Sequence, residues 1–265
     1  AVSNPYGLIL VCGPTGSGKT TTLHSGLGFI NRPETKIWTA EDPVEITQRG
    51  LSQVQVNPRI GFDFAAAMRA FLRADPDVIM VGEMRDKETI SIGIQASLTG
   101  HLVLSTLHTN SAPESITRLL DMGMDPFNFS DSILCILAQR LARTLCADCK
   151  QSFHPSLEEY TSLARESGYE DFGKVAEISY ADELKLNQAV GCQSCNHKGY
   201  RGRMALHELL VGTDDIKRLI QNKAKIDEIR NQAITDGMTT LKQDGIEKIF
   251  AGYLDLLQVR KVCIK

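Results

Sequence analysis

The chain has 265 residues, 42% hydrophobic and 23% charged, which is the composition of an ordinary globular protein with a sizeable core. A formal net charge of -3 excludes a global attraction to nucleic acid or to anionic membranes. No apolar run approaches the ~20 residues of a membrane span, and the N-terminal run is too short for a signal peptide. The cytoplasm is therefore the expected location. Because Ala1 lies almost on the first expected strand, we expect the chain to be a piece of a longer protein.

The first motif is the glycine-rich segment GPTGSGKT at residues 13–20. It follows an apolar run at 8–11, which predicts a strand, and precedes a segment at 21–30 with helical character. This context is typical of a phosphate site, where loop N–H groups, a helix N-terminus and Lys19 attract the anion. The alternative, a chance glycine turn, does not explain the presence of Lys19 and Thr20. The hydroxyl of Thr20 is a suitable ligand for Mg²⁺. The sequence thus predicts binding of a nucleoside triphosphate. The residues expected at the phosphates are Gly13, Pro14, Thr15, Gly16, Ser17, Gly18, Lys19, Thr20 and Thr21.

Apolar runs alternate with helical patterns through the first half, which favours a parallel sheet flanked by helices. Strands are expected at 36–40, 50–57, 77–83 and 101–110, and a helix at 64–73. Acidic residues including Glu41 follow the strand at 36–40. Because ligand-binding groups gather beyond the carboxyl ends of parallel strands, Glu41 is placed to face the nucleotide. A simple polar turn helped by Pro43 explains the same residues, and position alone leaves both readings open.

The strand at 77–83 ends in Glu83, an acid placed to hold Mg²⁺ or to polarise the attacking water. A buried strand ending in a surface acid is the alternative, which the upstream Lys19 disfavours. Asp86 is expected to cap a helix that begins near Lys87. His108 is a candidate to sense the γ-phosphate, although a lone histidine at a strand end is more often structural. Arg69 and Arg73 lie four residues apart, a spacing that usually marks a solvated helix face.

Helices are expected at 113–123 and 126–145, the latter because Ile133, Leu137 and Leu141 recur at one-turn spacing. Two CxxC pairs follow. In an intracellular nucleotide-binding protein such pairs favour a metal site over a disulfide or a redox motif, and four thiolates complete a closed, structural zinc site. A small helical insert is expected between the pairs, whose cysteines are Cys146, Cys149, Cys192 and Cys195.

The remainder predicts a short strand pair or turn at 200–209, then amphipathic helices at 214–221, 226–235, 240–250 and 254–262. We therefore expect an α/β fold with a parallel central sheet, a small tetracysteine zinc subdomain and C-terminal helices. The expected division is a nucleotide-binding core at 1–145, a metal-binding insert at 146–198, and the rest of the core with the C-terminal helices at 199–265.

Four segments stand in an order that resembles the secretion ATPase superfamily: GPTGSGKT at 13–20, TAEDPVE at 39–45, DPDVIMVGEMRD at 75–86 and GHLVLSTLHTN at 100–110. They resemble its Walker A motif, Asp box, atypical Walker B motif and His box. With the cysteine pairs and GYRGRMALHEL at 199–209, the chain looks like the type II secretion and type IV pilus assembly ATPases. Retraction ATPases of the same superfamily lack the metal-binding insert. The resemblance covers nearly the whole chain.

This resemblance implies a RecA-like P-loop core that uses ATP and Mg²⁺, with Zn²⁺ at the cysteines. It implies that Glu83 activates water, that Glu41 supports the metal or the water, and that His108 belongs to the box linked to γ-phosphate sensing. Arg69, Arg73 and Arg85 match arginines associated with charge stabilisation or subunit contacts. The family forms ring hexamers on the cytoplasmic face of the inner membrane, where ATP hydrolysis moves a platform protein. Its members carry N-terminal domains that are not in this sequence, so we expect weak hydrolysis by this chain alone.

Three other functions fit the motifs less well. A nucleic-acid translocase on the same core needs a basic channel or stacking aromatics, and with 6% aromatic residues and a net charge of -3 we expect no nucleic-acid partner. A signalling GTPase usually carries Asn-Lys-x-Asp, whereas residues 222–225 here read NKAK. A pilus retraction ATPase is disfavoured by the cysteine pairs. The residues do not separate secretion from pilus assembly.

Overall fold

A computed structural model of the chain describes residues 1–168, 180 and 183–263. The chain divides into two compact units by its internal contacts. Unit 1 comprises Ala1–Gln139 and Leu209–Met238, and unit 2 comprises Arg140–Glu208 and Thr239–Lys265. Two of the three boundaries fall inside the long strands at 133–145 and 200–211, and the third falls between two C-terminal helices. The three-part division expected from the sequence stays a prediction. Within the described residues, no helix is both long and apolar enough to cross a membrane.

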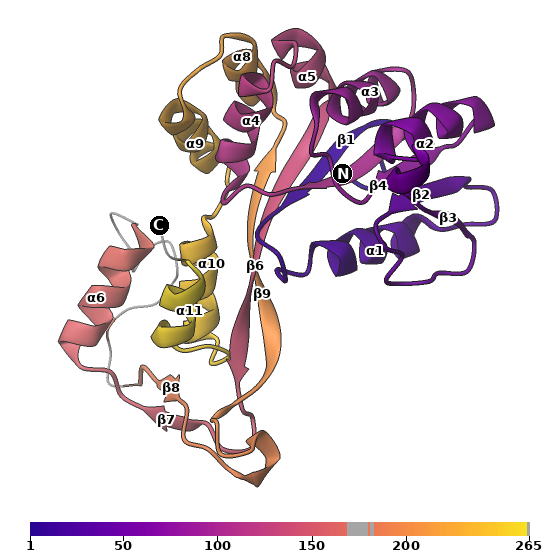
Figure 1. Ribbon diagram of the computed structural model, residues 1–265. Helices are drawn as coiled ribbons and strands as arrows, with labels where there is room; N and C mark the ends of the chain where they lie inside the picture. Colours follow the sequence, from indigo (N-terminus) through magenta and orange to yellow (C-terminus); the bar gives the residue numbers. More distant parts are fainter. Residues whose placement is uncertain (169–179, 181–182, 264–265) are drawn as a thin grey trace. The chain divides into compact units, whose positions relative to one another are not determined.

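A seven-stranded sheet, formed by described residues, runs in the order β3-β2-β4-β5-β1-β6-β9 (Figure 1). The strand pairs from β3 to β6 are parallel, which confirms the parallel sheet predicted from the alternating pattern. The strands are β1 (Gly7–Cys12), β2 (Ile37–Glu41), β3 (Leu51–Gln55), β4 (Val78–Val81), β5 (Leu102–Leu107), β6 (Ile133–Leu145) and β9 (Tyr200–Val211).

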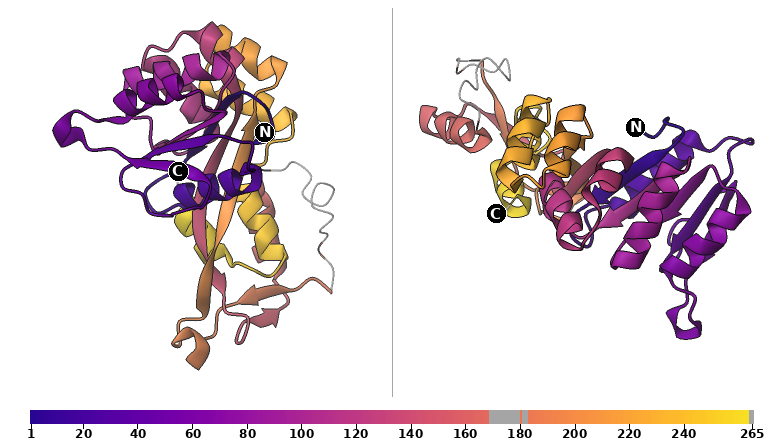
Figure 2. Two further views of the ribbon diagram at one scale, coloured as in Figure 1. Left: turned by 90° about the vertical axis from the view of Figure 1, so that its right-hand side faces the viewer. Right: turned by 90° about the horizontal axis from the view of Figure 1, so that it is seen from above.

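Helices cover both faces of this sheet in unit 1, with α1 on one face and α2 and α3 on the other (Figures 1 and 2). Asp86 caps α3 as predicted, and its side chain accepts a hydrogen bond from the backbone N–H of Thr89 at 2.8 Å. The helices of unit 1 are α1 (Lys19–Ile30), α2 (Phe64–Phe71), α3 (Lys87–Leu98), α4 (Ala112–Asp121), α5 (Pro126–Ser132), α8 (Asp214–Gln221) and α9 (Ile226–Thr235), with short 3-10 turns η1 (Pro58–Ile60) and η2 (Leu72–Ala74).

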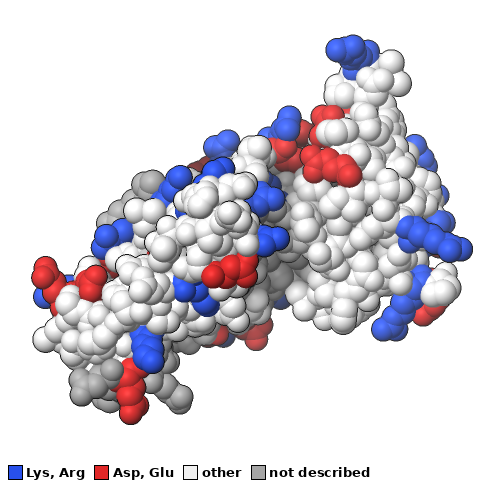
Figure 3. All heavy atoms as spheres, turned by 90° about the horizontal axis from the view of Figure 1, so that it is seen from below, with Lys and Arg blue, Asp and Glu red and all other residues white. Residues whose placement is uncertain are grey.

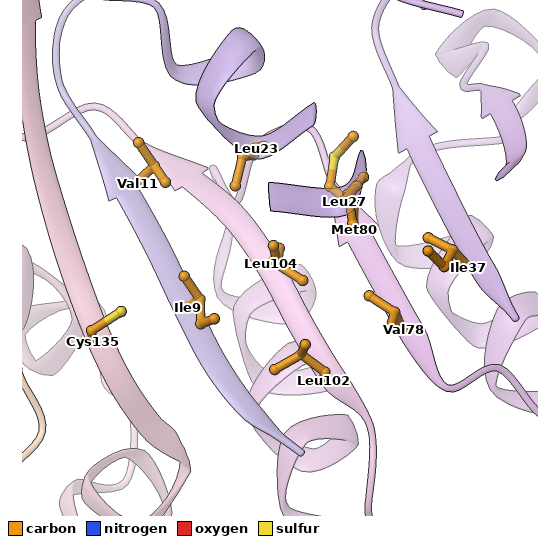
Figure 4. Packing of buried hydrophobic residues seen from close by; sticks show 10 residues of the cluster. All are labelled: Ile9, Val11, Leu23, Leu27, Ile37, Val78, Met80, Leu102, Leu104 and Cys135. Carbon is orange, nitrogen blue, oxygen red and sulfur yellow. The ribbon is translucent and has the colours of Figure 1, made fainter. Parts of the chain in front are cut away.

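The core beneath α1 is built from alternate residues of the parallel strands. Leu23 and Leu27 of α1 pack against a layer of strand side chains that is continuous from β6 to β2 (Figure 4). Burial of these apolar groups fixes the helix against the carboxyl half of β1 and β5. The layer consists of Ile9, Val11, Ile37, Val78, Met80, Leu102, Leu104 and Cys135.

Unit 2 contains a small antiparallel pair, β7 (Gln151–Phe153) and β8 (Leu186–Gln188), together with helices and the cysteine pairs. The helical insert predicted between the cysteine pairs is present as α6 (Leu157–Ser167), which begins with a capping box at Ser156 and Glu159. The remaining elements are η3 (Gln193–Cys195), α10 (Leu241–Phe250) and α11 (Leu256–Val262). The four C-terminal helices thus lie where the sequence pattern predicts them.

The single helix predicted over residues 126–145 is wrong. The chain is helical only in α5 and then forms the long strand β6, which pairs in parallel with β1. The run Ile133–Leu137 is continuously apolar, because a strand beside the sheet centre is covered on both faces, and such a run fits helical spacing equally well. The short strand pair expected at 200–209 is likewise the first part of one strand, β9.

Replacement of Asp86 by alanine tests the α3 cap. The Asp86 carboxylate also accepts the Thr89 hydroxyl at 2.8 Å, so the variant loses two hydrogen bonds at a helix N-terminus. We expect the free energy of unfolding to fall by ~1 kcal/mol in urea titrations. Asp121→Ala, at the exposed C-terminal end of α4, is the matched control and should leave that free energy within ~0.5 kcal/mol. Equal effects of the two substitutions would contradict the assignment.

Candidate active site and metal centre

The glycine-rich loop joins the buried strand β1 to helix α1. Gly16 and Gly18 have φ angles of 79° and 88°, in the left-handed region that glycine adopts without steric cost. A Cβ atom built on Gly16 would meet nothing within 4 Å, so glycine is required there for conformation rather than for space. The ammonium group of Lys19 folds back over the loop and donates to the carbonyls of Gly13 at 2.8 Å and Pro14 at 3.2 Å.

The N-terminus of α1 differs from the other α-helices that the structure describes. It alone has neither a side chain capping its first turn nor an acidic residue within that turn. Its first turn contains Lys19, Thr20 and Thr21. Uncapped N–H groups and the positive end of the helix dipole together favour a bound anion. Among the residues that the structure describes, the buried hydroxyl of Ser17 also finds no hydrogen-bond partner, which suits a loop that is completed by a ligand.

Gln139 of β6 fixes the loop to the helix, a role that the sequence did not reveal. Its amide nitrogen donates to the carbonyl of Ser17 at 2.7 Å, and its amide oxygen accepts from the hydroxyl of Thr22 at 2.7 Å. Gln139 is 2% exposed, so this bridge lies in the protein interior. The sequence held no signal for it, because the segment was expected to be helical.

Glu83 meets two of the residues predicted to act with it. Strand β5 lies between β1 and β4, and the carboxyl ends of all three reach one edge of the sheet. At this edge the N–H of Gly13 donates to the carbonyl of Leu107, and the N–H of Met84 donates to the carbonyl of Thr106. At this edge the Glu83 carboxylate lies 2.5 Å from the Arg85 guanidinium and 3.0 Å from Nε2 of His108. The hydrogen bond and the attraction of Glu83 raise the pKa of Arg85 above its ordinary value.

Glu41 occupies a different environment from Glu83. It is 3% exposed, and both of its carboxylate oxygens have partners inside the protein. Oε1 accepts from the Thr39 hydroxyl at 2.6 Å and from Nε2 of Gln53 at 3.0 Å, whereas Oε2 lies 3.1 Å from Nε2 of His24. Sequence reasoning missed His24 and Gln53, which lie on α1 and β3.

Arg69 and Arg73 lie on the surface of unit 1 and are not among the residues paired with Glu83 in the described structure. Arg69 pairs with the exposed Glu88 of α3. The α-helix ends at Phe71, so Arg73 belongs to the 3-10 turn η2 instead of continuing the predicted helix face. The catalytic and phosphate-binding roles of all these residues stay predictions.

The four cysteines of the CxxC pairs meet in unit 2, with their sulfur atoms all within 4.8 Å of one another. The Sγ–Sγ distance is 3.9 Å for Cys146–Cys192 and 3.8 Å for both Cys149–Cys195 and Cys192–Cys195. A tetrahedral ion with Zn–S bonds of ~2.3 Å requires sulfurs ~3.8 Å apart, so the cluster fits such an ion. Backbone N–H groups of Cys192 and Gly199 donate to Cys195 and lower its pKa to about 6, which favours the thiolate that a metal requires.

Comparison with known proteins agrees with this geometry. The profile of a family described as type II/IV secretion system protein matches residues 1–261. The chain belongs to this family. It is 47% identical over 261 residues to the type II secretion system ATPase E of Vibrio cholerae, covering 98% of this chain and 49% of that protein. It is also 47% identical to the type IV pilus assembly ATPase PilB of Myxococcus xanthus, covering 98% and 44%.

The fold is also similar to that of a solved pilus motor. A crystal structure of the pilus retraction motor PilT with bound ADP superposes with a TM-score of 0.71 at 28% identity, covering all of this chain and 63% of that one. This likeness supports the α/β core on which the predicted phosphate loop lies. The present chain spans about half the length of the curated relatives.

Metal analysis tests the cysteine cluster. We expect one zinc per chain, lost in Cys195→Ser because three thiolates leave the tetrahedral site open. Cys263→Ser, which alters a cysteine outside the cluster, should keep the full metal content. Protons compete with zinc for the Cys195 thiolate, whose pKa without metal is about 6, so acidification well below that pH should release zinc. A wild-type protein without metal, or equal metal in both variants, would contradict this assignment.

Proposed function

We propose that this chain is the ATP-binding and ATP-hydrolysing part of a motor that drives type II protein secretion or type IV pilus assembly. The observation that carries the proposal is the uncapped N-terminus of α1 behind a glycine-rich loop, with Lys19 at its first position. Residues 13–21 would hold the phosphates through loop N–H groups, and Lys19 would exchange its loop carbonyls for phosphate oxygens. Thr20 would be a ligand of Mg²⁺, which supplies positive charge to the phosphates when bound.

Hydrolysis requires a group that orients water and takes its proton as the terminal P–O bond breaks. Glu83 is suited to this role, because it lies at the same sheet edge as the loop and keeps a carboxylate only partly covered by protein. Arg85 and His108 hold this carboxylate in place and bring donor groups to the edge where charge develops on the leaving phosphate. Glu41 was expected to support the metal or the water, but its two carboxylate oxygens contact His24, Thr39 and Gln53.

The relatives support a role in a larger assembly. In a ring of six copies, the exposed Arg69 and Arg73 would be available to a neighbouring subunit, and the assembled motor would act at the cytoplasmic face of the inner membrane on a platform protein. The zinc site would hold the insert of unit 2 together, because a closed four-thiolate site has no open position for a substrate.

Two alternative functions are less well supported. Identity is 47% to assembly and secretion ATPases but 28% to the retraction motor, and the four-cysteine cluster favours the assembly class. A nucleic-acid translocase needs a basic track. On the face drawn in Figure 3, Lys and Arg form small separate groups with Asp and Glu between them.

The rate of ATP hydrolysis per chain, measured at increasing protein concentration for the wild type and matched variants, tests the proposed activity. We expect wild-type ATP hydrolysis per chain to rise with concentration, as neighbouring subunits complete the site. Lys19→Ala should abolish both nucleotide binding and turnover, whereas Glu83→Gln should bind ATP within about threefold of wild type and lose turnover by ~100-fold or more.

Lys261→Ala, on the surface of α11, is the charge-matched control for Lys19→Ala and should resemble wild type. A near-zero rate of ATP hydrolysis that does not change with protein concentration, together with intact nucleotide binding, would mean that cationic groups needed for catalysis come from outside this chain. Turnover that persists in Lys19→Ala would contradict the proposal.

A further inference from the structure

His24 lies inside the protein on the helix that carries the phosphate loop. It belongs to α1, one turn beyond Lys19, and is 2% exposed. Leu23 and Leu27 of the same helix pack against the sheet. A buried imidazole must have polar partners, and these partners define its role.

Both ring nitrogens of His24 have a partner from a different segment. Nδ1 lies 3.3 Å from Oε1 of Gln48, in the loop that follows β2, and Nε2 lies 3.1 Å from Oε2 of Glu41, the last residue of β2. The amide nitrogen of Gln48 donates to the backbone carbonyl of His24 at 3.0 Å. Three side chains and one carbonyl thus join α1 to the end of β2 and its loop.

These contacts fix where the hydrogens lie. The backbone carbonyl of His24 can only accept a hydrogen bond, so the NH₂ group of the Gln48 amide must face it. The amide oxygen of Gln48 must then face Nδ1 of the His24 ring. Nδ1 of His24 therefore carries a hydrogen and donates it. Nε2 of His24 and Oε2 of Glu41 then share one hydrogen in the hydrogen bond between them.

The other oxygen of Glu41 is equally engaged. Oε1 accepts hydrogen bonds from Thr39 and Gln53, and Gln53 also donates to Ile46 at 2.8 Å and accepts from the N–H of Gln48 at 2.7 Å. Thr39, His24 and Glu41 of this network are buried, and Gln48 and Gln53 are half-buried. Both oxygens of Glu41 are therefore engaged by protein groups, Oε2 by His24 and Oε1 by Thr39 and Gln53.

We propose that His24 is a positioning residue for the nucleotide site, and that Glu41 acts through His24 instead of touching metal or water. This inference rests on the proposed function. The network ties α1 to β2, and so sets the uncapped N-terminus of α1 against the carboxyl ends of the strands. Gln139 fixes the first turn of α1, and His24 fixes the second.

ADP affinity without Mg²⁺, measured by calorimetry, tests this role, because it excludes metal binding and water activation. His24→Leu should weaken ADP binding by tenfold or more, since Glu41 and Gln48 lose their shared partner. Glu41→Ala should do the same. Glu41→Gln should stay within threefold of wild type, because its NH₂ group can donate to Nε2 of His24 while its oxygen still accepts from Thr39 and Gln53. His101→Leu, at the opposite end of the sheet, is the control and should be unchanged.

A second measurement guards against misfolding of His24→Leu. Nitrogen-15 NMR of the unchanged chain should find the His24 hydrogen on Nδ1, and a bare Nδ1 would overturn the proposal. Equal weakening by Glu41→Gln and Glu41→Ala would also overturn it. If Lys19→Ala loses ADP binding while folded His24→Leu binds ADP as tightly as wild type, the positioning role is overturned and the proposed function stands. Absence of ADP binding by the unchanged chain would overturn the proposed function and, with it, the positioning role.

Discussion

The parallel alignment of β2, β4, β5 and β1 is the constraint on which the candidate site depends. It brings the ends of four strands to one edge of the sheet, although their sequences are far apart. The glycine-rich loop, Glu83 and His108 each follow one of these ends directly. Hydrogen bonds across the edge, such as that from Gly82 N–H to the Ala40 carbonyl at 2.8 Å, continue the sheet geometry into the loops.

The two acids of this edge have contrasting surroundings. The Glu83 side chain is 15% exposed and is held by Arg85 and His108, which are themselves more exposed. Glu41 faces inward and is enclosed by hydroxyl, amide and imidazole groups. A buried carboxylate is tolerated only where such partners replace water. The difference separates an acid available for chemistry from one that stabilises the arrangement of α1 and β2.

Much of the fold and part of the site could be predicted from the sequence. The loop at 13–20, the strand that ends before Glu83, the Asp86 cap and the C-terminal helices each have a local signal: glycine spacing, an apolar run, a capping residue or helical periodicity. The strand β6 had no such signal, because an apolar run in a two-sided core fits either helix or strand. Gln139 and His24 could not be recognised, since their roles depend on partners that only the folded chain brings close.

The central claim is that the loop N–H groups and the first turn of α1 are the phosphate-binding donors. Amide hydrogen exchange with and without Mg²⁺-ADP tests it most directly, because bound phosphates must protect the donors themselves. The account predicts that nucleotide slows exchange most strongly within residues 13–21. Bound nucleotide that leaves this segment unprotected, and protects another part of the chain, would contradict it.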